Sequence, residues 1–148
     1  MSQLLAELRA ARERGDPGPL IAAVPYARFL GFSVVAREGE MLGVMRYSDA
    51  LIGNPMLPAL HGGTLCALLE STAIFEICWG VELVGLPKTI TMTVDYLRSG
   101  RPVDTFAKGR ICRQGRRVVN VHVEAWQEDR TRPIAAALGH FLLPSGEP

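Results

Sequence analysis

The sequence predicts an α+β protein in which one curved antiparallel sheet wraps around a single long helix. Residues 64–79 are apolar on almost every helical face, which is typical of a helix enclosed by its own domain. The flanking segments show the two-residue alternation of strands. A chain of 148 residues has room for one such core, so we expect a single domain over residues 1–148.

The N-terminal residues predict a helix and a turn, together residues 1–19. Gly15 ends this helix before a turn rich in proline and glycine. Residues 20–30 predict a second short helical or irregular piece that ends at Gly31 and covers an edge of the core. At the other end of the chain, residues 144–148 are expected to fray.

Two strands are expected before the long helix, over residues 32–37 and 41–47, joined by a turn that contains Gly39. Residues 48–60 are rich in Gly, Asn and Pro, and they predict a loop. The long helix ends at Gly80.

Four strands are expected after the long helix. In the first, residues 88–97, the apolar Ile90, Met92, Val94 and Tyr96 alternate with hydroxyl and acidic side chains, which predicts one buried face. Residues 103–113 and 116–127 form a hairpin, and residues 133–143 form the last strand. Because one sheet cannot cover an all-apolar helix on every side, we expect a homo-oligomer.

Composition narrows the classes of function. A formal net charge of +1 lacks the basicity of a non-specific nucleic-acid binder. No apolar run is long enough to span a membrane, and the N-terminus has no apolar signal segment, so we expect a cytoplasmic protein. The three cysteines are an odd number without CxxC spacing, which favours reduced thiols and no metal site. No motif calls for a cofactor.

The start of the long helix holds the residues best suited to chemistry. Gly62 and Gly63 follow His61 where free backbone N–H groups and the positive end of the helix dipole face outward. With no side chain in the way, the Gly63 N–H can hold a developing oxyanion. Glu70 lies mid-helix among aliphatic residues, where a carboxylate is costly unless it has partners or a function. His61 is interpreted as a helix cap or a residue that orients the loop.

The run from His61 to Glu70 resembles the signature of hotdog-fold acyl-CoA thioesterases of the phenylacetate-degradation and 4-hydroxybenzoyl-CoA type, with the acid nine residues after the histidine. The order of elements is also similar over residues 20–143. The resemblance implies the hotdog fold, hydrolysis of an acyl-CoA thioester, no cofactor and a homotetramer. Glu70 would then act as nucleophile or as a base on water, two roles that the sequence leaves open.

Spacing on the helix predicts how such a site is assembled. Gly63 and Glu70 are seven residues apart, so they share a face but stand about 10 Å apart along the axis. One helix therefore cannot bring both to one thioester. Two antiparallel helices across a twofold axis would place Gly63 of one chain opposite Glu70 of the other, so we expect a dimer with two equivalent sites.

The resemblance also implies an amide side chain six residues before the histidine. That position is Pro55 here, and Asn54 lies one residue earlier, so Asn54 is the candidate for binding the substrate. A hydroxyl residue is common in the family four residues after the acid, whereas this chain has Ile74. The apolar helix and the strand that carries Tyr96 are expected to line the acyl tunnel.

A second constellation is basic. Seven bases and one acid lie between residues 98 and 117. Coenzyme A is a polyanion and guanidinium groups pair well with phosphates, so Arg98, Arg116 and Arg117 are the expected contacts to the acyl-CoA.

Two other functions compete with hydrolysis. The scaffold could be a non-catalytic module that binds acyl-CoA or lipid, which the shifted Asn54 and the family departure at Ile74 keep open. It could also be a hotdog hydratase or dehydratase, which would require a histidine placed to work with the acid.

Overall fold

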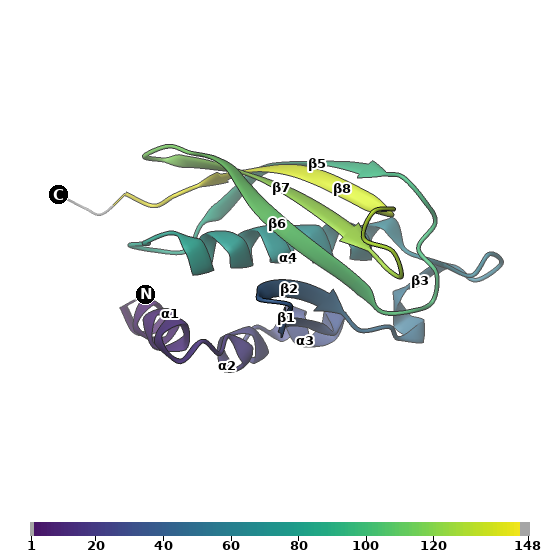
Figure 1. The fold of residues 1–148 in the computed structure, drawn as a ribbon, viewed down its shortest axis with the longest axis horizontal. Coiled ribbons are helices and arrows are strands. Elements are labelled where there is room, and N and C mark those ends of the chain that lie inside the picture. Colours follow the sequence, from purple (N-terminus) through teal and green to yellow (C-terminus); the bar gives the residue numbers. More distant parts are fainter. Residues whose placement is uncertain (1, 146–148) are drawn as a thin grey trace.

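The fold is described from a computed structural model over residues 2–145, so the frayed tail expected at 144–148 lies largely outside the described residues. Three helices precede two strands, a small hairpin, a long helix and four more strands (Figure 1). The predicted α+β order and the curved antiparallel sheet around a long helix are confirmed.

The N-terminal region forms α1 (Ser2–Arg14), α2 (Gly18–Ala22) and α3 (Pro25–Leu30). The single piece expected over residues 20–30 is therefore two helices, because Pro25 starts a new one. Gly31 ends α3 with a left-handed φ of 68°, as a C-terminal glycine does.

The main sheet has six antiparallel strands in the order β1-β2-β6-β7-β8-β5. They are β1 (Phe32–Arg37), β2 (Glu40–Met45), β5 (Lys88–Tyr96), β6 (Thr105–Gln114), β7 (Val118–Trp126) and β8 (Ala135–Leu142). Both predicted hairpins are present, β1–β2 and β6–β7. The order leaves β1 and β5 at the two edges of the sheet.

The long helix α4 (Gly62–Gly80) crosses beneath the sheet and packs on β6, β7 and β8, with β2 beside it (Figure 1). Its core positions include Leu65, Leu69 and Ala73, which are essentially inaccessible to solvent. The opposite side of α4 is only partly covered by the N-terminal helices. A line of residues along this side is at least partly accessible, and we call it the open strip: Gly63, Ala67, Glu70 and Ile74.

A guanidinium group holds the C-terminal end of α4. Arg12 of α1 donates through Nε to the carbonyl oxygen of Cys78 at 2.8 Å, and its other nitrogens reach the carbonyl of Val81 and the carboxylate of Glu82. A cation at this end satisfies free carbonyl groups and complements the helix dipole. The N-terminal helix is thus fixed to the helix that carries the candidate site.

Strand β5 differs from its sequence pattern in burial. The alternation predicted that Ile90 and Tyr96 are buried, but their exposed fractions are 53% and 56%. The reason is that β5 is an edge strand, so the side chains along its free edge have no neighbouring strand.

A β-bulge also changes which way the β5 side chains face. Thr89 pairs with Phe141 of β8 while Thr91 pairs with the next residue, His140, so Ile90 is the extra residue. Phe141 is fully buried on the helix side of the sheet, which puts Thr89 on that side as well. Regular alternation would have placed Thr89 and Thr91 on one face, and the sequence expectation for Thr89 was therefore wrong.

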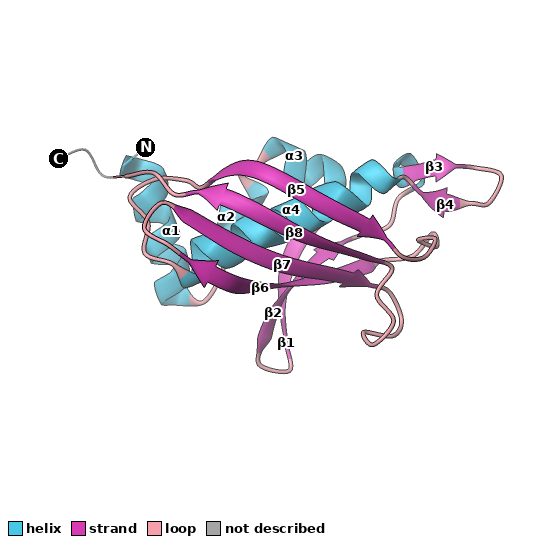
Figure 2. Ribbon diagram, turned by 90° about the horizontal axis from the view of Figure 1, so that it is seen from above, coloured by secondary structure: helices cyan, strands magenta, loops and turns pink. Residues whose placement is uncertain are grey.

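Residues 48–60 were expected to form a loop, yet they contain a small hairpin, β3 (Ile52–Asn54) with β4 (Ala59–Leu60), after a short 3-10 helix at Asp49–Leu51. Gly53 permits it, since a Cβ there would stand 2.7 Å from the Cα of His61. The hairpin projects beyond the main sheet at the N-terminal end of α4 (Figure 2). Within residues 2–145, no helix combines the length and the apolar character needed to cross a membrane.

Two fully buried threonines allow a test of the core. The hydroxyl of Thr72 in α4 has no hydrogen-bond partner among the described residues, whereas that of Thr105 bonds Gln127 Nε2 at 3.2 Å. Thr72→Val removes an unsatisfied polar atom, and we expect it to raise the free energy of unfolding by about 1 kcal/mol. Thr105→Val breaks a bond and should lower it by about 1 kcal/mol. Urea unfolding measures both, and destabilisation by Thr72→Val would contradict the assignment.

Candidate active site

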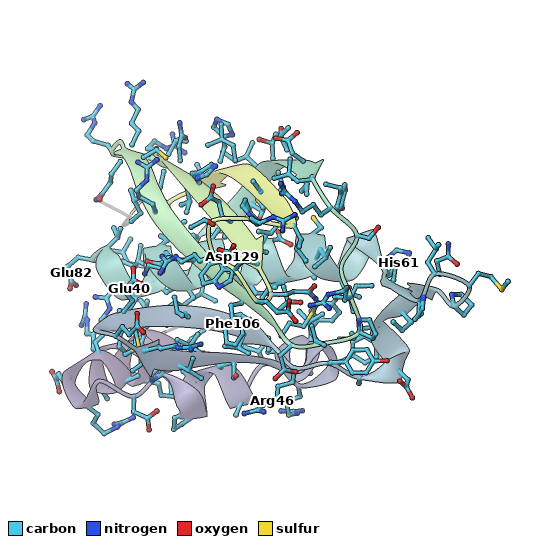
Figure 3. All side chains as sticks on the ribbon, turned by 45° about the vertical axis from the view of Figure 1, so that its right-hand side comes forward. Glu40, Arg46, His61, Glu82, Phe106 and Asp129 are labelled. Carbon is cyan, nitrogen blue, oxygen red and sulfur yellow. The ribbon has the colours of Figure 1, made fainter. Side chains whose placement is uncertain are left out.

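His61 caps the N-terminus of α4. Its backbone is extended, and its ring Nδ1 accepts a hydrogen bond from the Gly63 N–H at 2.8 Å. The acceptor role of Nδ1 puts the ring proton of the neutral imidazole on Nε2. The capping role considered from the sequence is therefore confirmed. In Figure 3, His61 lies at the end of α4 that adjoins the projecting hairpin, and Glu82 lies past the opposite end.

The same bond changes the candidate oxyanion donor. The Gly63 N–H, expected to face a substrate, is occupied by the His61 ring. No described residue accepts a hydrogen bond from the Gly62 N–H, which is at the first position of the helix. Tyr96 of β5 holds Gly62 in place, because the Tyr96 hydroxyl donates a hydrogen bond to the Gly62 carbonyl oxygen at 2.9 Å. Gly62 rather than Gly63 therefore presents the free donor.

Glu70 is half-buried on the open strip, with its carboxylate beside β5. Thr89 donates a hydrogen bond to Glu70 Oε1 at 2.6 Å, which the bulge in β5 makes possible. None of the salt bridges among the described residues involves Glu70. One carboxylate oxygen is therefore oriented by a neutral donor, and the negative charge is not neutralised by a neighbouring base.

Cys66 lies one helical turn before Glu70. Burial raises the pKa of the Cys66 thiol, and the negative charge of Glu70 raises it further. The thiol therefore stays protonated at neutral pH and is a poor nucleophile. Burial also raises the pKa of the neighbouring Tyr96, with a smaller contribution from Cys66.

The two groups best suited to catalysis do not meet within one chain. Gly62 and Glu70 are eight residues apart, or about 12 Å along the helix axis. A reacting carbonyl must contact an oxyanion donor and lie within about 3.5 Å of the attacking atom. The separation predicted from the sequence therefore applies to Gly62 as well as to Gly63.

A cavity of about 420 Å³ opens beside Gly62. Its walls include Leu60, Leu65, Tyr96 and Arg98. The guanidinium of Arg98 is held at the rim by a 2.6 Å hydrogen bond to the carbonyl oxygen of Pro133. Gly62 and the exposed cation Arg98 both line this cavity, which suits a ligand with an anionic arm.

The other expected arginines lie elsewhere. Arg117 is at the end of the sheet where β5 begins, because its carbonyl bonds Leu143 and Lys88 pairs with Leu142. Arg98 follows the opposite end of β5, and nine strand residues span about 26 Å. Arg116 and Arg117 therefore cannot contact the same phosphate as Arg98 within one chain.

The basic run is also partly neutralised. Lys108 donates to Glu76 at 2.6 Å, and Arg101 pairs with Glu128. Burial raises the pKa of the Glu76 carboxyl, and the hydrogen bond and charge of Lys108 oppose that shift. The strands spread the basic side chains over the length of the sheet, so within one chain they do not form a single patch.

Asn54, the expected amide ligand, ends β3 in the projecting hairpin and is exposed. Its Oδ1 accepts a hydrogen bond from the Met56 N–H at 3.0 Å, so the side chain stabilises its own turn. No recorded hydrogen bond links Asn54 to Gly62 or Glu70 within the described residues. A role in binding remains a prediction that depends on the subunit opposite.

The remaining candidates lie away from Glu70. His122 and His140 alternate with fully buried residues of β7 and β8, on the sheet face opposite α4, where His140 contacts the Thr91 hydroxyl. Burial raises the pKa of Cys78 to about 11, and Arg12 opposes the shift. Across residues 2–145, no group of His, Cys, Asp and Glu has the geometry to hold a metal ion.

The fold and this site define a class of protein, an antiparallel sheet around one helix with a carboxylate mid-helix and a glycine pair at its start. The chain belongs to the thioesterase superfamily, whose sequence model matches residues 57–134. The hotdog fold expected from the sequence is therefore confirmed.

Known relatives extend over nearly the whole chain. The medium/long-chain acyl-CoA thioesterase YigI of Escherichia coli K12 is 26% identical over 158 aligned positions, covering 97% of this chain and 99% of the relative. A crystal structure from Chromobacterium violaceum is 36% identical, with a TM-score of 0.77, and the match covers 96% of this chain and 99% of that one.

A putative thioesterase from Ralstonia eutropha JMP134, a phenylacetic acid degradation-related protein, is 25% identical with a TM-score of 0.71, over 81% of this chain and 91% of that one. A Bacillus halodurans protein whose structure was solved with CoA shares the fold at 20% identity and a TM-score of 0.75, over 99% of this chain and 91% of that one.

The residue that sequence reasoning missed is Thr89. Its alternation with Ile90 and Met92 placed it on the outer face, and no local signal marks the bulge that turns it toward Glu70. Two threonines that flank an isoleucine are typical of a regular strand. The bulge depends on pairing with β8, which is more than forty residues away in the chain.

The contact between Glu70 and Cys66 predicts a pKa change. Replacing Glu70 by Gln removes a negative charge and keeps the shape of the side chain, so the pKa of the Cys66 thiol should fall. Carbon-13 NMR of labelled cysteine side chains in a Cys112→Ser background would follow the titration. The Cys78 titration, which Glu70 does not influence, provides an internal control. An unchanged Cys66 titration would place the carboxylate elsewhere.

Proposed function

We propose that this protein hydrolyses acyl-CoA thioesters to free acid and CoA, with Glu70 and the Gly62 N–H as the reacting groups. The observation that carries the proposal is a carboxylate free of salt bridges, held by Thr89 at 2.6 Å, on the accessible side of a helix that begins with an unoccupied backbone donor. The acyl-CoA thioesterase activity of the E. coli relative supports the same reaction.

The chemistry follows from the two groups. The Gly62 N–H stabilises the negative charge that develops on the thioester oxygen. In the first route, Glu70 acts as a base and removes a proton from a water molecule while that water adds to the carbonyl carbon. In the second route, the Glu70 carboxylate adds to the carbonyl carbon and forms an anhydride, which water then hydrolyses. In both routes the C–S bond breaks and the CoA thiolate leaves. Thr89 orients one oxygen of Glu70, and the second remains for the reaction.

A dimer supplies the missing proximity. The open strip includes Gly63, which has no side chain, and Ala67, which has only a methyl group, so a second helix can approach closely. Next to it, the edge of β5 has no strand neighbour. A second copy that adds its β5 antiparallel to this edge covers both surfaces at once, and it brings Gly62 of one subunit toward Glu70 of the partner subunit.

The spacing of residues along α4 and along β5 supports the same twofold axis. On α4, Gly62 and Glu70 are each four residues from Cys66. On β5, the residues that contact them are Tyr96 and Thr89, and their midpoint falls between Met92 and Thr93. An axis that passes Cys66 on the helix and the middle of β5 on the sheet therefore relates both pairs together.

The antiparallel dimer also gives the arginines a common ligand. It reverses one chain end for end, which brings Arg116 and Arg117 of one subunit toward Arg98 of the other. We infer that the cavity beside Gly62 takes the pantetheine arm and that Arg98 with the partner's Arg117 binds the phosphates. The CoA complex of the Bacillus halodurans protein, which shares the fold, is compatible with this ligand.

The competing functions lead to different outcomes. A hydratase would need a histidine beside Glu70, and within the described residues all three histidines lie elsewhere: His61 in the cap, His122 and His140 on the outer face. A binding module would retain acyl-CoA without releasing a free thiol. We propose hydrolysis because, among residues 2–145, Thr89 is the one hydrogen-bond partner of the Glu70 side chain and no base pairs with its charge.

Assembly and location extend the proposal. The three cysteines are free thiols, which is typical of proteins in a reducing compartment, and we propose that the enzyme acts in the cytoplasm. The resemblance to phenylacetate-type thioesterases favours a homotetramer made from two of the dimers described above.

The first test measures free thiol release from acyl-CoA. Glu70→Gln should lower kcat by about 10²- to 10⁴-fold, because general-base and nucleophilic roles both need the carboxylate. Glu124→Gln, a matched change at an exposed acid of β7, should leave kcat unaltered. Unchanged turnover in Glu70→Gln would overturn the proposed function, and binding without turnover in the wild type would support the module.

The second test asks whether the site is shared between subunits. Gly62→Ala adds a Cβ 3.2 Å from the Tyr96 ring and should inactivate the protein, as should Glu70→Gln. Random mixing of the two variants gives half heterodimers, each with one intact site of two, so about a quarter of wild-type activity should return. Each variant mixed with itself is the control. Failure to regain activity in dimers shown to have exchanged would place the site within one chain.

A further inference from the structure

Helix α3 carries an aromatic pair that the proposed chemistry leaves unused. Tyr26 and Phe29 are 54% and 67% exposed, and their rings stack with centroids 5.9 Å apart. The same short helix buries Ala27 and Leu30 in the core. Two stacked rings held by a well-anchored helix form a rigid apolar surface that water solvates poorly.

Helix α3, which carries the aromatic pair, lies at the β5 edge of the molecule (Figure 2). In Figure 2, α3 and β5 lie along the same long edge, and the β1–β2 hairpin lies along the opposite one. Helix α3 packs on one side of α4. On the other side, Thr89 of β5 donates its hydrogen bond to Glu70. The open strip thus runs between the edge of β5 and α3.

Within α3, the residues beside the two rings are mostly apolar. Arg28 is the charged residue of α3, and its side chain turns back to donate a 2.7 Å hydrogen bond to the carbonyl oxygen of Ala22. Val24, which precedes the helix, is apolar and half-exposed. An apolar ligand group that packs on Phe29 and Val24 therefore displaces no water that is hydrogen-bonded to those side chains.

The reacting carbonyl divides the substrate into two arms. The CoA arm is a polyanion, and the cation on its route is Arg98, in the cavity at the β5 side of Gly62. The acyl arm leaves the carbonyl in the opposite direction, toward the side of the open strip that α3 borders. The charged arm and the apolar arm therefore each meet a wall of matching chemistry.

We propose that Tyr26 and Phe29 form the acyl subsite and select thioesters with an apolar acyl group long enough to reach α3, either an alkyl chain of about eight carbons or more or an aryl group. This inference rests on the proposed function. The sequence analysis expected the acyl tunnel beside the strand that carries Tyr96. The subsite proposed here lies instead on the other side of α4, at α3.

Activity across a substrate series tests the subsite. In the wild type, kcat/KM should rise from acetyl- and butyryl-CoA to octanoyl- and dodecanoyl-CoA. Phe29→Ala and Tyr26→Ala should each lower kcat/KM for the long substrates by about tenfold, chiefly through KM, because one ring contact of about 1.4 kcal/mol is lost. Acetyl-CoA turnover should stay within about twofold. Phenylacetyl-CoA tells an aryl preference from an alkyl one.

A matched control and a conservative variant sharpen the result. Leu138→Ala removes a 40% exposed side chain from the outer face of β8 and should not alter the chain-length profile. Phe29→Leu should recover part of the long-chain activity but less of the activity on phenylacetyl-CoA. An equal loss on all substrates, or no loss on any, would overturn the inference.

Binding separates this inference from the reaction itself. In the Glu70→Gln background, calorimetry should show tighter binding of octanoyl-CoA than of acetyl-CoA, and Phe29→Ala should abolish that difference even if the protein hydrolyses nothing. If the rings instead contact the partner subunit, Phe29→Ala would shift the protein from dimer to monomer in analytical ultracentrifugation with a uniform loss of binding, which would refute the subsite.

Discussion

The structure depends on an apolar helix that its own chain does not fully enclose. The sheet covers α4 on one side, β2 and the N-terminal helices cover others, and Arg12 closes its C-terminal end. The side that remains holds Gly63, Ala67 and Glu70. Because burial of apolar surface is the main source of stability, this gap is the place where binding of a second molecule gains most. In the dimer that we propose, catalytic chemistry and assembly would therefore share one surface.

The elements with regular periodicity could be predicted from the sequence. The six main strands and α4 follow from alternation and from an all-apolar run, and their boundaries differ from the structure by only a few residues. The small hairpin at Ile52–Leu60 could not be predicted, because Pro55 and Pro58 are typical of loops and its two strands are very short. Its formation depends on close contact between Gly53 and His61, a tertiary effect.

For the candidate site, the sequence indicates residues but not the hydrogen bonds that they form. Glu70 follows from a carboxylate among aliphatic side chains, and the start of the helix follows from the two glycines. Which N–H is free depends on the rotamer of His61, which occupies the Gly63 donor. Thr89 depends on a bulge set by pairing with β8. Both are decided by geometry that a linear pattern does not contain.

The free edge of β5 has a consequence for aggregation. Antiparallel addition about the point between Met92 and Thr93 would place Thr89 opposite Tyr96 and Ile90 opposite Asp95, so no like charges meet. Stacking of identical strands in parallel register, as in amyloid, would align Lys88 with Lys88 and Asp95 with Asp95 in every layer. The two end charges therefore permit a closed pair and oppose a growing fibril, and once the pair has formed no edge of β5 is left to recruit another chain.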